Sequence, residues 1–244
     1  MTTSSYSWLS LQQMLDSALP IGSFAHSYGL ETLVQKGEIR TGADLHRYLA
    51  GMLRQSWAVS DAMVIKAAYG KPEKPGRQEL PASAEFAESL EYACRVERLV
   101  HLQRLGIETR EGIEKTGRRL LKLAPALWPE LPLEDLRQAV SERRSLGTHP
   151  LVYGWICLKL GVPLDRAAEG YLYMCAQTCV NAALRLMAMG QQEAQRILSR
   201  TLPSIAEAWQ EARGMDPEEA YGAMPLAEMA MIRHERLYSR LFMS

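Results

Sequence analysis

Residues 164–189 read LDRAAEGYLYMCAQTCVNAALRLMAM and form the longest apolar helical segment of the sequence. It is apolar around most of a helical circumference, which is typical of a helix at the centre of a bundle or across an oligomer interface. Its part from Tyr171 to Met189 is nearly long enough to span a bilayer, but Gln177, Asn181 and Arg185 interrupt it at four-residue spacing. An arginine in a membrane span costs roughly 3 kcal/mol. We therefore expect a buried core helix, whose three polar residues form either a solvent-facing stripe or a polar patch at a contact.

The apolar residues of the remaining chain also recur mostly at helical spacing. After a first amphipathic segment at about 8–18, we expect helices near 25–36, 41–69, 83–103, 107–124, 133–144, 149–160, 164–189 and 191–213, and a last one from Pro225. Three prolines and a glycine predict an exposed loop at 71–81. There is no strand-like alternation and no internal repeat. The sequence predicts an all-α fold, a single compact bundle of about nine or ten helices formed by residues 1–244.

The composition limits the class of protein. Of the 244 residues, 47% are hydrophobic and 23% are charged, which is enough apolar material for a packed core. The formal net charge is zero, whereas proteins that bind nucleic acid usually carry a basic excess, so we expect no nucleic-acid partner. We also expect no secretory signal at the N-terminus, no membrane partner and a cytoplasmic location.

The side chains that carry chemistry are scattered. The five histidines form no metal-binding motif, and no phosphate-binding loop or nucleophile elbow is present. Cys175 and Cys179 share one helical face and could begin a zinc site, but in so apolar a segment they are typical of core packing. We therefore expect no catalytic residues, no metal ligands and no cofactor.

Residues 19–31 read LPIGSFAHSYGLE, which is dense in glycine, serine and aromatic residues where a loop meets a helix. Gly29 would let two backbones approach closely, and Ser27 and His26 could satisfy free amides at the start of a helix. The stretch is either a tight interhelical corner or a partner-binding surface built on that corner.

Residues 233–244 read RHERLYSRLFMS and are unusually apolar for the end of a chain. Chain ends are normally polar and frayed, so this segment must dock somewhere. It either docks back onto its own core or inserts into a groove of a partner, with Arg240 as a charged anchor.

These two segments resemble the N-terminal and C-terminal signatures of the UreF family of urease accessory proteins. Between them, THPLVYGW at 148–155 and AALRLMAMGQQEAQRIL at 182–198 also resemble the family, in the same order and at similar spacing. Ala25 and Met243 depart from residues that are common at those positions. The resemblance covers nearly the whole chain.

The resemblance implies an all-α homodimer that is not an enzyme. It further implies an adaptor that joins UreD (also called UreH) and the GTPase UreG on the urease apoprotein. That assembly promotes carbamylation of an active-site lysine and nickel insertion, coupled to GTP hydrolysis by UreG.

The resemblance also assigns roles to individual residues. It implies a contact surface at Ser27, Tyr28, Gly29, Leu30 and Glu31; a segment ordered by UreD that contains His234, Glu235, Tyr238, Arg240, Leu241 and Phe242; a dimer contact at Tyr173; and a GTPase-facing position at Arg185.

Three hypotheses follow from these residues. In the first, the protein is a non-catalytic adaptor whose tail gains its packing only when UreD covers it. In the second, it is a helical metal-dependent hydrolase with Glu31 or Glu235 as the base. In the third, Arg185 or Arg240 acts beside the phosphates of UreG as an arginine finger.

Overall fold

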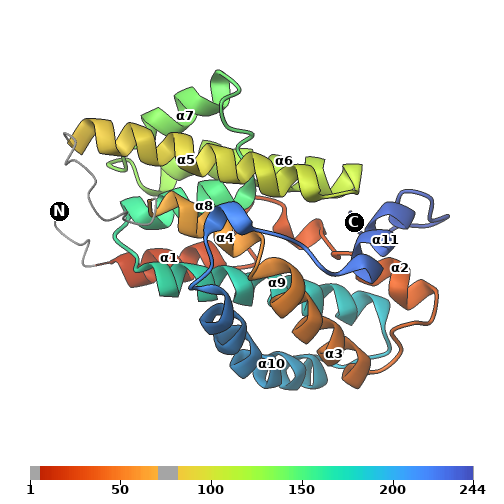
Figure 1. Cartoon of the computed structure of the whole chain (residues 1–244). Coiled ribbons are helices and arrows are strands. Elements are labelled where there is room, and N and C mark those ends of the chain that lie inside the picture. The colour runs from red at the N-terminus through yellow and green to blue at the C-terminus, as the bar shows by residue number, and fades with distance from the viewer. Residues whose placement is uncertain (1–5, 71–81, 244) are drawn as a thin grey trace.

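A computed structural model describes residues 6–70 and 82–243 of the chain, and in this part all of the regular structure is helical (Figure 1). The elements are α1 (Ser7–Leu15), η1 (Ser23–Ala25), α2 (Leu30–Gln35), α3 (Gly42–Met52), η2 (Leu53–Trp57), α4 (Asp61–Ala68), α5 (Ala82–Gln103), α6 (Ile107–Leu127), α7 (Glu134–Ser141), α8 (His149–Lys159), α9 (Leu164–Leu186), α10 (Gln191–Ala212), η3 (Pro217–Glu219) and α11 (Pro225–His234). The all-α prediction is confirmed, with eleven α-helices in the described residues. The predicted loop at 71–81 lies outside them.

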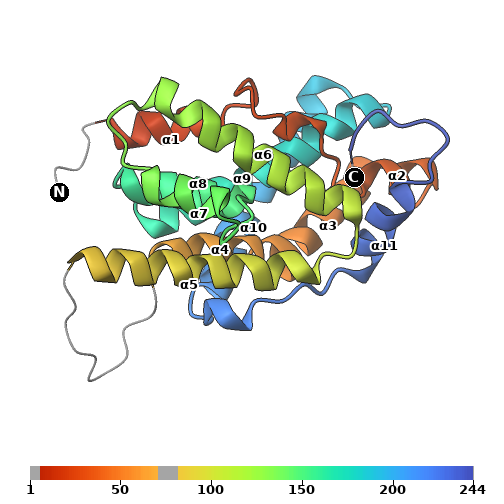
Figure 2. The ribbon, with the colours of Figure 1, turned by 90° about the horizontal axis from the view of Figure 1, so that it is seen from above.

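Helix α9 is the centre of the bundle, as its sequence predicts. It packs against α1, α2, α3, α4, α8 and α10, and most of its side chains are buried (Figures 1 and 2). Cys175 and Cys179 are free thiols in the core, and burial raises the pKa of both. Within the described residues, no helix is long and apolar enough to cross a membrane.

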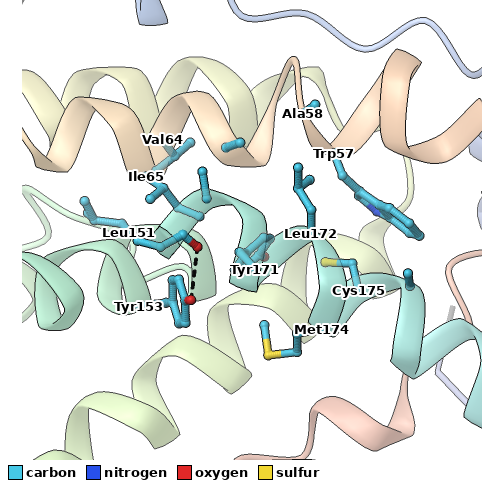
Figure 3. Close-up of a cluster of buried hydrophobic side chains, with 14 of the residues drawn as sticks. Trp57, Ala58, Val64, Ile65, Leu151, Tyr153, Tyr171, Leu172, Met174 and Cys175 are labelled. Atoms are coloured by element: carbon cyan, nitrogen blue, oxygen red, sulfur yellow. Dashed lines mark hydrogen bonds between the residues drawn. The ribbon is translucent and has the colours of Figure 1, made fainter. Parts of the chain in front are cut away.

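A cluster of buried hydrophobic side chains lies where α4, α8 and α9 meet (Figure 3). Ile65, Leu151 and Tyr171 are fully buried there. A Cβ atom on Gly154 would stand 3.0 Å from the Ile65 Cα atom, so this glycine lets α4 and α8 approach closely. The buried Tyr153 hydroxyl donates a hydrogen bond to the Ala167 carbonyl at 3.0 Å, which joins α8 to α9.

The predicted helix at 41–69 is wrong in one respect, because it breaks into α3, the π-turn η2 and α4. Its start is as expected, with a capping box between Thr41 and Asp44. The break leaves some backbone carbonyls without a helical hydrogen-bond donor, and amides of a later segment donate to them. The Ala223 amide donates to the Gln55 carbonyl at 2.7 Å, and the Tyr221 amide donates to the Val59 carbonyl at 3.0 Å.

The predicted helix at 25–36 is also shorter than expected. The turn η1 and an extended His26 precede it, and α2 begins only at Leu30. The reason is a left-handed backbone at Tyr28 and Gly29, with φ of 53° and 83°.

Two glycines in α6 that should weaken this helix serve close packing instead. A Cβ atom on Gly112 would lie 2.2 Å from His26 Cε1, and one on Gly117 would lie 2.2 Å from the Gly147 carbonyl oxygen. Helix α6 therefore rests directly on the His26 ring and on the segment that leads into α8.

Candidate partner-binding site

The two unusual segments of the sequence lie against each other. After α11 the chain turns back toward the start of α2 and ends beside it (Figures 1 and 2). The Ser27 amide donates to the Met243 carbonyl at 3.0 Å, and the Met243 amide donates to the Ala25 carbonyl at 2.6 Å. Residues 235–243, here called the tail, thus form one surface with the N-terminal segment.

The turn at Tyr28 and Gly29 sets the position of α11, which leads into the tail. A Cβ atom on Gly29 would lie 3.0 Å from the Ala227 carbonyl oxygen and 3.1 Å from the Ala230 Cβ atom. Any side chain there would push α2 away from α11. The Thr32 hydroxyl adds a hydrogen bond of 2.9 Å to the Ala230 carbonyl.

Glu31, in the first turn of α2, receives the tail. Its carboxylate is fully buried and accepts the amides of Leu241 at 2.8 Å and Phe242 at 3.1 Å. A carboxylate is favoured at this position because the amino end of a helix carries partial positive charge. Glu31 therefore satisfies two tail amides that would otherwise need another acceptor.

His234, the last residue of α11, stands between two carboxylates. Its Nε2 atom lies 2.9 Å from a Glu31 oxygen, and its Nδ1 atom lies 2.8 Å from a Glu108 oxygen. The protonated imidazolium is the form that can donate to both. Arg240 pairs with the other Glu108 oxygen, so Glu31, His234, Glu108 and Arg240 form one continuous chain of polar contacts, here called the network.

Phe242 is the apolar anchor of the tail and is only 8% exposed. The guanidinium of Arg185 covers its ring, with 5.1 Å between the guanidinium carbon and the ring centroid. This distance is typical of a cation–π contact. Arg185 therefore contacts the tail of its own chain.

The network leaves other side chains facing outward. Tyr238 is fully exposed at 106%, Leu241 is 56% exposed, and Phe24 on η1 is 60% exposed. Glu235 and Arg240 are also on the surface. The expectation that the tail gains its packing only under a partner is thus wrong for Phe242, whereas Tyr238 and Leu241 do have apolar area left to cover.

The residues of the N-terminal segment lie mostly beneath this surface. Ser27, Gly29 and Leu30 are buried and Tyr28 is half-buried. The Tyr28 hydroxyl points to Cys175 Sγ at 3.8 Å, and its carbonyl accepts the Tyr48 hydroxyl. These residues hold the tail in place and leave little of their own area for another protein.

A second surface feature is an open groove between α1, α9 and α10, with a volume of about 1100 Å³. Tyr173 and Gln177 of α9 line one wall, and Trp8 and Leu202 stand on the others. Trp8 and Leu202 are both exposed. The groove is therefore an uncovered and partly apolar surface, here called the α1–α10 groove.

A third surface feature is a stripe of exposed apolar side chains along α11 and the turn between α5 and α6. Its members are Leu102, Leu105, Ile107, Leu226, Met229 and Ile232. Leu105 and Met229 of this stripe border a hollow of about 260 Å³ that Arg104 and Glu228 also line. The stripe lies on the same helix that leads into the tail.

Within 6–70 and 82–243, no group of three or more His, Cys, Asp or Glu side chains could hold a metal ion. Glu31, the base in the hydrolase hypothesis, is buried and occupied by His234 and the tail amides.

The family profile of UreF matches residues 39–202. Urease accessory protein UreF of Arthrobacter sp. (strain FB24) is 31% identical over 236 residues, covering 97% of this chain and 96% of the relative. The proteins of the same name from Paenarthrobacter aurescens (strain TC1) and Bacillus sp. (strain TB-90) are each 30% identical, over 97% of this chain.

The chain belongs to the UreF family.

As a member of the UreF family, the protein is an accessory protein and not an enzyme. The hydrolase hypothesis is therefore wrong, and for Glu31, one of its two candidate bases, burial adds a physical reason. A general base must reach the proton that it removes, and this carboxylate is enclosed.

The sequence did not point to two residues that matter in this UreF surface. Glu108 binds both His234 and Arg240, yet it lies more than 120 residues away and shows no motif. Phe24 is exposed within the N-terminal segment, and an exposed aromatic in a turn could have been singled out as a contact residue.

Proposed function

We propose that this urease accessory protein acts as an adaptor, with the tail and α11 as the docking surface for UreD. The observation that carries the proposal is the tail itself, held by Glu31 and Phe242 while Tyr238 and Leu241 project outward. Exposed aromatic and aliphatic side chains on a fixed backbone are typical anchors in protein interfaces.

The apolar stripe on α11 extends this docking surface. Leu226, Met229 and Ile232 follow at helical spacing and are exposed on the helix that leads into the tail. A partner that covers the tail would meet this stripe next. We therefore expect UreD to bury both.

The same proposal includes a homodimer formed through the α1–α10 groove. Tyr173 lines this groove, beside the exposed Trp8 and Leu202. An isologous contact of two such surfaces would cover apolar area that one chain leaves open. The resulting dimer would present two tail surfaces, and UreG and the urease apoprotein would join an assembly organised around them.

Arg185 and Arg240 are better explained as structural groups of the tail than as arginine fingers. Arg185 covers Phe242, and Arg240 pairs with Glu108. Either would have to leave its partner before it could reach a phosphate. We therefore propose a scaffold that positions UreG, through which nickel passes to urease as cargo.

The test uses the full-length protein with UreD in a pull-down assay, followed by activation of urease. The double substitution Tyr238→Ala and Leu241→Ala should abolish UreD binding and urease activation, because both remove exposed apolar area. Tyr6→Ala removes an exposed aromatic at the start of α1 and is the matched control. Binding that survives the double substitution would reject the docking surface.

A further inference from the structure

His234 joins the start of the tail to the bundle through both of its ring nitrogens. Its side chain is fully buried at the end of α11, and the two helices that pack on α11, α2 and α6, each bring one carboxylate to the ring. The Nε2 atom lies 2.9 Å from a Glu31 oxygen, and the Nδ1 atom lies 2.8 Å from a Glu108 oxygen. Each ring nitrogen therefore meets a hydrogen-bond acceptor.

This arrangement sets the number of protons that the three groups hold. A neutral imidazole has one N–H group, so its other nitrogen would turn a lone pair toward a carboxylate oxygen. The imidazolium has an N–H group on each nitrogen and can donate to both carboxylates at once. The docked tail therefore requires one proton more than two carboxylates and a neutral ring would hold.

The neighbouring charged groups make this proton decisive for Glu31. Arg240 of the tail pairs with Glu108, and Glu235 accepts the Glu108 amide at 3.5 Å. Arg233, the other basic side chain at the end of α11, is exposed. Within the described residues, the other groups that donate to the Glu31 carboxylate are uncharged amides. Without the proton on His234, this buried carboxylate would have no cation in contact with it, which is costly.

We propose that the proton on His234 is a pH-sensitive latch, which holds the tail against α2 and α6 and releases it as the pH rises. An exposed imidazole, as in a released tail, loses its proton at about pH 6.5. The docked state then binds one proton more than the released state. Docking is therefore favoured at lower pH and is weakened progressively as the pH rises above about 6.5.

Release of the tail would change what the molecule presents to other proteins. Tyr238 and Leu241 are exposed on a backbone that the latch holds in place. A free tail would have to be ordered again before these side chains could be covered, at a cost in binding free energy. The latch itself is a property of the isolated chain and goes beyond the adaptor role; only its effect on UreD binding rests on that role.

The first measurement uses the wild-type, full-length protein and needs no variant. Labelling the histidine rings with ¹⁵N gives NMR signals from only five residues, which makes His234 accessible. At a pH of about 7.5, both ring nitrogens of His234 should carry a proton, because both donate in the docked tail. A single protonated nitrogen in a chain whose tail is docked would overturn the proposal.

Hydrogen exchange then measures the release of the tail in the same protein. The Phe242 amide donates to Glu31, so it exchanges when the tail opens. Its protection factor, which corrects for the ordinary pH dependence of exchange, should fall by up to about tenfold per pH unit, since one proton leaves with each release. The Leu172 amide, in the core of α9, should keep its protection. Constant protection of Phe242 between pH 7 and 8.5 would overturn the latch.

Glu108→Gln separates the proton from the rest of the contact. The glutamine amide can donate to an unprotonated Nδ1 atom of His234 while its oxygen accepts Arg240, so a neutral ring satisfies both neighbours. The protection of the Phe242 amide should then vary by less than about twofold over the same pH range. A Glu108→Gln variant that keeps the pH dependence of the wild type would contradict the proposal.

Two substitutions beside the latch serve as controls. Glu235→Gln removes the adjacent exposed carboxylate, and His26→Gln removes the other histidine next to the tail, whose backbone forms a bridge with Met243. Both variants should keep the pH dependence of the wild type, since neither removes a group that contacts the His234 ring. Loss of that dependence in either control would assign the switch to another group and overturn the proposal.

Discussion

The surface around the tail and the α1–α10 groove differ in how much of their apolar area the chain itself covers. At the tail, the chain covers its own Phe242 and pairs every buried charge, with Glu31 and Glu108 around His234. At the groove, Trp8 and Leu202 stay open, and the Arg166–Glu169 ion pair among its lining residues joins two positions of α9 and does not bridge the groove. The first surface is fixed before any partner arrives, whereas the second gains its packing only when something fills it.

This difference separates stability from association. Substitutions in the buried network around the tail should lower the free energy of unfolding, because they leave buried charges without partners. Substitutions in the groove should leave folding intact and weaken only self-association.

Glu31→Ala should cost about 3–5 kcal/mol in the free energy of unfolding, since it leaves the buried His234 and the Leu241 and Phe242 amides without their acceptor. Urea denaturation followed by circular dichroism measures the loss. Glu235→Ala is the control, because Glu235 is exposed and makes one long hydrogen bond of 3.5 Å, and it should stay within about 0.5 kcal/mol of the wild type. Equal stability of the two variants would mean that Glu31 does not hold the tail.

Leu202→Asp should weaken the homodimer by about 100-fold, because a charge in the groove must be desolvated when a second chain covers it. Analytical ultracentrifugation over a range of protein concentrations gives the dissociation constant. Leu226→Asp is a closely matched control, since Leu226 on α11 is 52% exposed and Leu202 is 46% exposed. If both variants dimerise like the wild type, the groove is not the interface.

The helices and the core were predictable from the sequence, since they depend on apolar spacing within each segment. The central position of α9 and the core role of Cys175 and Cys179 follow from one apolar stretch. The break between α3 and α4 was not predictable in this way. It depends on Tyr221 and Ala223, which lie more than 160 residues further along the chain. Their amides donate hydrogen bonds to the backbone carbonyls that the break leaves without helical partners.

The candidate surface was predictable only in its parts. Both terminal segments stood out by composition, but composition gives no sign that Glu31 accepts the amides of Leu241 and Phe242. Glu108 and Arg185 are ordinary charged helix residues until the fold brings them to His234 and Phe242. Contacts between residues so distant in sequence are set by packing, which no local pattern encodes.

Phe242→Ala should release the tail without unfolding the bundle, because Phe242 is its buried anchor. The lost burial of a phenylalanine amounts to about 1.5–3 kcal/mol, so the Ser27 amide, bonded to Met243, should exchange hydrogen roughly 10- to 100-fold faster. Hydrogen exchange read by NMR measures this change. Leu241→Ala shortens an exposed side chain two residues before Met243, which forms a β-bridge with His26. It should leave the exchange rate of the Ser27 amide unchanged. Similar rates in both variants would show that Phe242 is no anchor.

Arg185→Ala should have the smallest effect, about 0.5–1 kcal/mol, since one partly exposed cation–π contact with Phe242 is lost. The expected result is a modest rise in Ser27 exchange, together with unchanged GTP hydrolysis by UreG in the assembled complex. Combining Arg185→Ala with Phe242→Ala sharpens the test, because two residues that act through one contact should cost less together than the sum of their separate effects. Full additivity would mean that Arg185 does not act through Phe242. A collapse of GTP hydrolysis in the Arg185→Ala variant would support the alternative that Arg185 faces UreG.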